Sequence, residues 1–194
     1  MTRTNYTLVD HAAALDDACR EILSAPVIGV DTETTGFDPY RSRIRLLQLA
    51  VPGRNIVIDL FKVPALRHPK LREALSSPDR IKVLHNAKFD LKMLLHHGAI
   101  EVQGVFDTLL ASKLIAAGAG DVSHGLAAVS ERYLEEEVDK GVWQARPAEA
   151  RTVFSQKPRN LWRTLYDGTH SAVAREDTAP AQLAATFADT AKSL

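Results

Sequence analysis

Residues 27–37 read VIGVDTETTGF, an apolar run after Pro26 that ends in two acids, and this stretch decides how the chain folds. The apolar run is typical of a buried strand, and on a strand Asp31 and Glu33 project from the same face. Two adjacent carboxylates repel each other and are costly to bury unless a positive charge lies between them. We therefore expect a divalent cation here, Mg²⁺ or Mn²⁺, because oxygen ligands suit these ions. The alternative interpretation is a surface strand end that carries two solvated acids.

The composition is that of an ordinary globular domain. The 194 residues are 45% hydrophobic and 25% charged, which is enough for one domain with a core. Lys plus Arg and Asp plus Glu both total 24, so the charge neither announces nor excludes a nucleic-acid partner. The sequence contains no apolar run of 18 residues, so it predicts no membrane span. Residues 1–6 lack the apolar core of a signal peptide. Cys19 is the single cysteine, which excludes an intrachain disulfide and favours a reducing cytoplasm.

Alternating strand and helix patterns surround this stretch. We expect an opening helix at 10–24 with Asp10 as its N-cap, and later helices that include 87–97 and one capped by Asp107. The pattern predicts strands at 27–32, 44–51, 55–60, 81–85 and 102–106, and further helices at 68–76, 124–134 and from 180 onward. This order favours a mixed α/β sheet with helices on both faces. Residues 144–178 are polar and broken by proline, and we interpret them as an insertion or irregular segment.

A third carboxylate lies on a helix face that is partly apolar. Asp90 shares that face with Asn86, Met93 and Leu94, so it needs a partner if it is buried. A metal ion shared with Asp31 and Glu33 would be such a partner. The alternative is an acid that reaches solvent.

Several spaced motifs then resemble the DEDD superfamily of 3′–5′ exonucleases, in particular ribonuclease D-like enzymes and the proofreading domain of family-A DNA polymerases. The first motif reads DTETTG at 31–36 and the second HNAKFD at 85–90. QLA at 48–50, VFDT at 105–108 and HGLAAV at 124–129 are also similar to the family and follow in order. The resemblance implies a ribonuclease H-like fold, a mixed five-stranded sheet with helices on both faces, in one exonuclease domain that covers 1–194.

The resemblance also implies an activity and its residues. It implies hydrolysis of the terminal phosphodiester at a single-stranded 3′ end of DNA or RNA, releasing nucleoside monophosphates. Two ions, Mg²⁺ or Mn²⁺, would be held by four carboxylates: Asp31, Glu33, Asp90 and Asp189. By the same resemblance the terminal nucleotide would be contacted by Thr32, Thr34, Phe37, Asn86 and Phe89, with Phe37 wedged against its base.

The third motif of the family departs from its usual form here. Pro180, Gln182, Leu183 and Asp189 have the family spacing, but Ala185 stands where the family has a tyrosine that helps to orient the attacking water. Asp177 is the alternative fourth carboxylate. The missing tyrosine motivates a second hypothesis, a catalytically impaired nucleic-acid-binding module on the same fold.

Arginines alternate with other residues at the start of the expected second strand. Arg41, Arg43 and Arg45 can lie on one strand face and contact phosphates, or they can form a solvated face. The sequence alone leaves both interpretations open.

Overall fold

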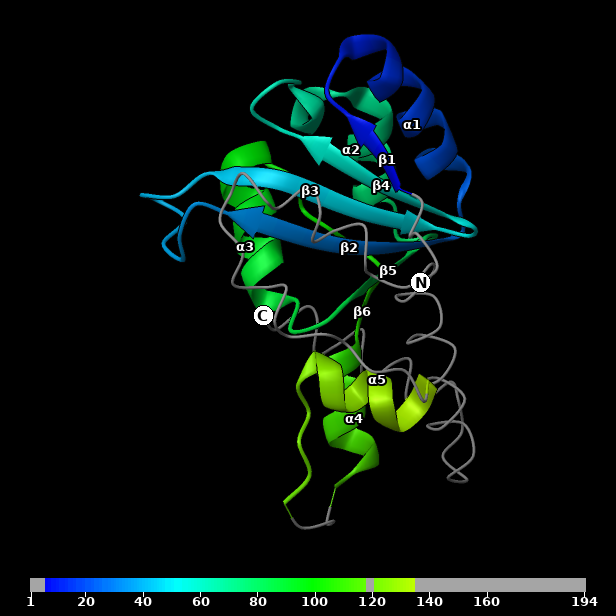
Figure 1. Cartoon of the computed structure of the whole chain (residues 1–194), viewed down its shortest axis with the longest axis vertical. Helices are drawn as coiled ribbons and strands as arrows, with labels where there is room; N and C mark the ends of the chain where they lie inside the picture. The colour runs from blue at the N-terminus through cyan, green and yellow to red at the C-terminus, as the bar shows by residue number, and fades with distance from the viewer. Residues whose placement is uncertain (1–5, 118–120, 135–194) are drawn as a thin grey trace.

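The computed structural model describes residues 6–117 and 121–134, and over these residues the chain forms a six-stranded sheet with helices on both faces (Figure 1). The strands are β1 (Tyr6–Val9), β2 (Val27–Thr34), β3 (Ile44–Val51), β4 (Arg54–Asp59), β5 (Ile81–Leu84) and β6 (Val105–Asp107). They lie in the order β1-β4-β3-β2-β5-β6. β3 is antiparallel to both its neighbours and the remaining pairs are parallel. The expected mixed α/β class is confirmed.

The helices fall into two groups, one on each face of the sheet. They are α1 (Ala12–Ser24), the short 3₁₀ helix η1 (Ala65–Arg67), α2 (Pro69–Ser76), α3 (Lys88–Gly98), α4 (Thr108–Ile115) and α5 (Leu126–Leu134). Figure 1 shows α1 and α2 beside β1 and β4 at the top of the view, and α4 and α5 together beyond β6 at the bottom. None of these helices, within the described ranges, has the length and apolar character that crossing a bilayer requires.

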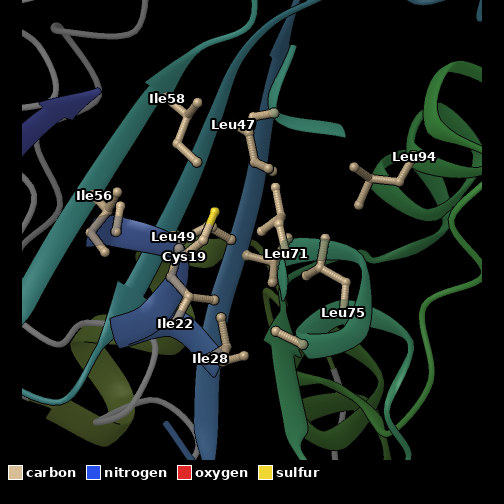
Figure 2. Packing of buried hydrophobic residues seen from close by; sticks show 14 of the residues in the cluster. Cys19, Ile22, Ile28, Leu47, Leu49, Ile56, Ile58, Leu71, Leu75 and Leu94 are labelled. Atoms are coloured by element: carbon tan, nitrogen blue, oxygen red, sulfur yellow. The ribbon is translucent and has the colours of Figure 1, made fainter. Parts of the chain in front are cut away.

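The larger part of the core joins one sheet face to α1, α2 and α3. Ile28, Leu47 and Leu49 of the sheet are buried there against Ile22 of α1 and Leu71 of α2 (Figure 2). A smaller cluster on the opposite face packs Val27 and Val83 against α4 and α5. Because Val27 and Ile28 point to opposite faces, β2 is buried on both sides, as its apolar run indicated.

β2 extends past the end of its parallel neighbour β5. Pairing with β5 covers Val27 to Gly29, whereas pairing with β3 continues to Thr34. The acidic end of β2 therefore projects beyond β5, next to the turn that leads from β5 into α3. The register with β3 shifts between Glu33 and Thr34, so Arg45 is an extra residue in a β-bulge.

Two strand predictions were wrong. The expected five strands omit β1, a four-residue edge strand in which Val9 alone is buried, so its sequence carries no clear alternation. The strand predicted at 102–106 begins instead at Val105. Gly104 precedes it with φ +65°, and a Cβ there would lie 2.4 Å from the Arg80 carbonyl oxygen, so this residue forms a turn rather than a strand.

Two helix termini also differ from the predictions. His11, not Asp10, caps α1, because Asp10 forms an ion pair with Lys62 at 3.0 Å while His11 Nδ1 accepts the Ala14 N–H. α3 includes Gly98, and the left-handed residue that ends it is Ala99, with φ +47°. The prediction that Asp107 caps the next helix is confirmed, since its carboxylate accepts the N–H groups of Leu109 and Leu110.

Candidate nuclease site

Asp31 and Glu33 lie side by side near the end of β2, as their spacing predicted, and a glutamine links them. Gln48 of β3 is directly opposite Asp31 in the register. Its side-chain Nε2 donates to Asp31 Oδ2 at 3.0 Å and to Glu33 Oε1 at 3.1 Å. Both amide hydrogens are therefore used to hold the two carboxylates together.

This role of Gln48 was not predicted from the sequence. A positive partner between the two carboxylates was expected to be a cation, and the positive end of the Gln48 amide dipole already lies there. The signal was present, because a buried glutamine interrupts the apolar run of β3. The pairing of Asp31 with Gln48 becomes visible only once the register of the two strands is known.

Asp90 is brought to the same end of β2 from α3 and is bonded to Thr32. Its Oδ1 accepts the Thr32 backbone N–H at 2.9 Å and the Thr32 hydroxyl at 2.6 Å. The N–H is available because β2 has passed the last residue that pairs with β5. Both residues are buried, so Asp90 does not reach solvent as the alternative interpretation had it.

The surroundings of Asp90 disfavour its negative charge. Burial, and secondarily the nearby charge of Asp31, raise the pKa of Asp90 to about 7, although the two hydrogen bonds from Thr32 act in the opposite direction. The site thus concentrates more carboxylate charge than its hydrogen-bond donors neutralise. A bound cation would relieve this imbalance.

The oxygen ligands of these carboxylates suit a hard divalent cation, although the described residues alone do not surround an ion. Carboxylate oxygens are the ligands that Mg²⁺ and Mn²⁺ prefer. Within residues 6–117 and 121–134, no three His, Cys, Asp or Glu side chains are arranged so as to hold a metal ion. Asp31 and Glu33 are turned toward Gln48, and Asp90 toward Thr32. Asp189 and its alternative Asp177 lie outside the described residues, as do Ala185 and the segment 144–178.

Asp107 fixes the turn from which α3 and Asp90 start. Asp107 Oδ1 accepts the Asn86 N–H at 3.0 Å and Oδ2 accepts the Ala87 N–H at 2.8 Å, in addition to capping α4. These bonds hold Asn86 in a left-handed conformation with φ +60°. Sequence reasoning identified Asp107 as a helix cap but not as the anchor of a second helix.

Thr108, next to Asp107, forms hydrogen bonds with the residues that lead from β5 into the same turn. Its hydroxyl donates to the Leu84 carbonyl at 3.1 Å, so its oxygen accepts from His85 Nδ1 at 2.9 Å. Burial lowers the pKa of His85, against the opposing charges of Asp107 and Asp31. The lowered pKa favours the neutral ring of His85, and the bond to Thr108 favours the tautomer that carries the proton on Nδ1.

The residues predicted to contact substrate differ in exposure: Phe37 and Asn86 are exposed, Thr34 and Phe89 are half-buried, and Thr32 is buried. Phe37 is 91% exposed, and its ring packs edge-to-face on Phe89 with centroids 6.3 Å apart. Thr32 is buried and bonded to Asp90, and Thr34 donates its hydroxyl to the Gly36 carbonyl at 2.6 Å. Asn86 is exposed on its turn. A nucleotide contact by any of these residues stays a prediction.

The three arginines have protein partners. Arg45 forms an ion pair with Asp59 at 3.0 Å and, like Arg43, lies over the ring of Phe61. Arg41 lies 3.7 Å from the carboxylate of Asp38. They do not form one strand face, because β3 begins at Ile44, so Arg41 and Arg43 lie in the loop that precedes it.

Comparisons with known proteins agree with this geometry. A family model described as 3′–5′ exonuclease matches residues 6–166. Ribonuclease D of Zymomonas mobilis is 31% identical over 151 residues, which cover 75% of this chain and 38% of that protein. Exosome complex exonuclease RRP6 of Saccharomyces cerevisiae is 27% identical over 164 residues, covering 82% of this chain and 22% of that protein. The chain thus spans well under half the length of these relatives.

Solved structures show the same fold. The structure of Brucella melitensis NrnC with bound Mg²⁺ superposes with a TM-score of 0.75 and 21% identity, over 99% of this chain and 91% of that one. At this identity the likeness speaks for the fold alone, and the match to the family model carries the classification. The chain therefore belongs to the DEDD 3′–5′ exonuclease family, as its first two motifs indicated.

Proposed function

We propose that this chain is a metal-dependent 3′–5′ exonuclease that shortens single-stranded DNA or RNA by one nucleoside monophosphate at a time. The observation that carries the proposal is the carboxylate cluster at the end of β2, where Asp31 and Glu33 share Gln48 and lie beside Asp90. Such a concentration of acidic side chains at one strand end destabilises the metal-free protein, and a bound cation would remove this repulsion. The cytoplasmic location expected from the single cysteine is part of the same proposal.

Each carboxylate has a defined task in this proposal. Asp31 and Glu33 would hold the cations with oxygens from one rigid strand, in positions set by Gln48, and the cations would neutralise the charge of the scissile phosphate. Asp90 is held by Thr32 through Oδ1, and its other oxygen would be the one offered to a cation. Asp189 would complete the set. Two Mg²⁺ or Mn²⁺ ions supply a water of lowered pKa and stabilise the leaving 3′ oxygen when they are bound.

The exposed ring of Phe37 is suited to the terminal base. It is anchored against Phe89, one residue before Asp90, so a base stacked on it would lie near the carboxylates. Stacking is tolerant of sequence, so we expect little base preference.

The test is a hydrolysis assay with defined ends and a matched acid control. Single-stranded DNA and RNA oligonucleotides are incubated with Mg²⁺, with Mn²⁺ or with EDTA, and the products are identified by chromatography. We expect 5′-mononucleotides with either metal, none with EDTA, and a loss of at least 100-fold in Asp31→Asn. Asp17→Asn is the control, because Asp17 is an exposed acid of α1 whose partner is Arg20, outside the carboxylate cluster.

The same assay separates the second hypothesis. A binding module would retain the oligonucleotide without hydrolysing it in either metal, in wild type and in Asp31→Asn alike. That result would overturn the exonuclease proposal.

A further inference from the structure

Two aromatic side chains are displayed on the loop that joins β2 to β3. Phe37 is 91% exposed and Tyr40 is 84% exposed. Figure 1 shows this loop projecting past the end of the sheet on the side where α3 lies. Phe37 has a proposed role at the terminal base, whereas Tyr40 has none.

The loop is ordered by its own hydrogen bonds. The backbone carbonyl of Asp38 accepts the N–H groups of Arg41 at 3.1 Å and Ser42 at 2.8 Å, and its carboxylate accepts the Tyr40 N–H at 2.9 Å. At the base of the loop, the Thr35 N–H donates to the Arg43 carbonyl at 3.0 Å, and the Arg43 N–H donates to the Thr35 hydroxyl at 3.0 Å. The backbone of the loop is therefore ordered before any partner arrives, which lowers the entropic cost of binding.

Each loop ring packs against a ring of α3. Phe37 meets Phe89 at 6.3 Å between centroids, and Tyr40 meets His96 at 4.8 Å and 70°. Phe89 and His96 are seven residues apart, so they share one face of the helix. At a rise of about 1.5 Å per residue, the two ring pairs lie roughly 10 Å apart along α3.

The charge between the two ring pairs is positive. Lys92 is exposed and follows Phe89 by three positions and precedes His96 by four, so it lies on the same helix face. The acid of α3, Asp90, is buried on Thr32. The acid of the loop, Asp38, faces Arg41 and the Tyr40 backbone.

We propose that Tyr40, Lys92 and His96 form a second contact for single-stranded nucleic acid, beyond the nucleotide held at Phe37 and Phe89. The inference rests on the proposed function, which places the end of the strand near the carboxylates. A base stacks on the Tyr40–His96 ring pair, and Lys92 meets the phosphates between the two positions. Rings that alternate with cationic groups are the usual means of binding a strand without reading its sequence.

The spacing of the ring pairs makes the contact depend on substrate length. Stacked nucleotides rise about 3.4 Å each, so roughly 10 Å corresponds to about three nucleotides. A strand of eight nucleotides spans both ring pairs, whereas a dinucleotide occupies the first alone.

The test measures affinity and KM with ring-removing and ring-retaining variants. Binding of a 5′-fluorescein eight-nucleotide strand is followed by anisotropy in EDTA, and KM is measured with Mg²⁺ for eight- and two-nucleotide strands. Tyr40→Ala and His96→Ala each weaken binding of the longer strand, and raise its KM, at least fivefold. KM for the dinucleotide stays within twofold. Tyr40→Phe keeps the wild-type affinity because it keeps the ring.

A matched control and the contrary outcomes separate this inference from the proposed function. Leu114→Ala removes an exposed apolar side chain from α4, far along the chain from the ring pairs, and leaves affinity unchanged. If the alanine variants bind and cleave the long strand as wild type does, the second contact is wrong while the exonuclease stands. If wild type neither binds nor cleaves, the proposed function fails first. A dimer of wild type that Tyr40→Ala dissociates in sedimentation would instead assign the rings to a second copy of the chain.

Discussion

Asp90 Oδ1 accepts both the backbone N–H and the hydroxyl of Thr32, at 2.9 Å and 2.6 Å. This pair joins the first acidic motif, on β2, to the second, on α3, across 58 residues of sequence. It gives Asp90 a fixed position and occupies one of its two oxygens, while burial raises its pKa to about 7. The protein therefore holds the Asp90 carboxylate in place while disfavouring its negative charge.

Asp90→Asn will stabilise the metal-free protein at high pH. The folded protein retains a proton on Asp90 that the unfolded chain loses near its ordinary value of 3.8, so the free energy of unfolding falls as pH rises from about 4 to 7. An asparagine oxygen accepts both Thr32 bonds and does not titrate. In urea denaturation with EDTA we expect the variant to be more stable than wild type at pH 8 by about 1–3 kcal/mol, and by much less at pH 5. A gain that is equal at both pH values would contradict this account.

Gln48→Leu will expose the repulsion between Asp31 and Glu33. Both carboxylates lose a donor, and we expect the metal-free protein to lose about 1–3 kcal/mol of unfolding free energy at pH 8. Mg²⁺ at pH 8 offsets the loss in part, because a bound cation replaces the missing donor between the two carboxylates. Gln103→Leu is the matched control, because Gln103 is exposed, and thermal unfolding should not distinguish it from wild type.

Asp107→Asn will loosen the start of α3 while sparing α4. Asparagine remains a good N-cap, but its NH₂ group replaces the oxygen that accepts the Ala87 N–H at 2.8 Å. Hydrogen exchange should accelerate at residues 86–89 and stay unchanged at Leu109 and Leu110. The exonuclease rate should fall at least fivefold with little change in KM, because the position of Asp90 depends on this turn. Faster exchange at the start of α4 alone would show that Asp107 is only a helix cap.

The sheet was largely predictable because its central strands carry long apolar runs. β3 was predicted with its observed bounds, and β2 and β4 were each located within two residues. β1 was missed because it is short and lies at an edge, where one buried residue gives no period. The close approach of Gly104 to the Arg80 carbonyl depends on tertiary packing, which local sequence patterns do not contain.

The candidate site was predictable where it depends on local spacing or on the two family motifs. The two-residue interval of Asp31 and Glu33 fixes their common face wherever the strand lies. Gln48 contacts these acids because of the register between β2 and β3, and Asp107 acts through the β5–α3 turn. Neither relationship can be read from the local sequence. The assignment of Asp189 over Asp177 lies outside the described residues and stays a prediction.

The most direct measurement is the pattern of products from a 5′-labelled single strand of twelve nucleotides, sampled over time with Mg²⁺ or Mn²⁺. The carboxylate cluster of Asp31, Glu33 and Asp90 predicts a ladder that shortens from the 3′ end one nucleotide at a time. It also predicts no ladder for Asp31→Asn and a normal ladder for Asp17→Asn. Internal cuts, release of the labelled end first, or an unchanged ladder in Asp31→Asn would contradict the account.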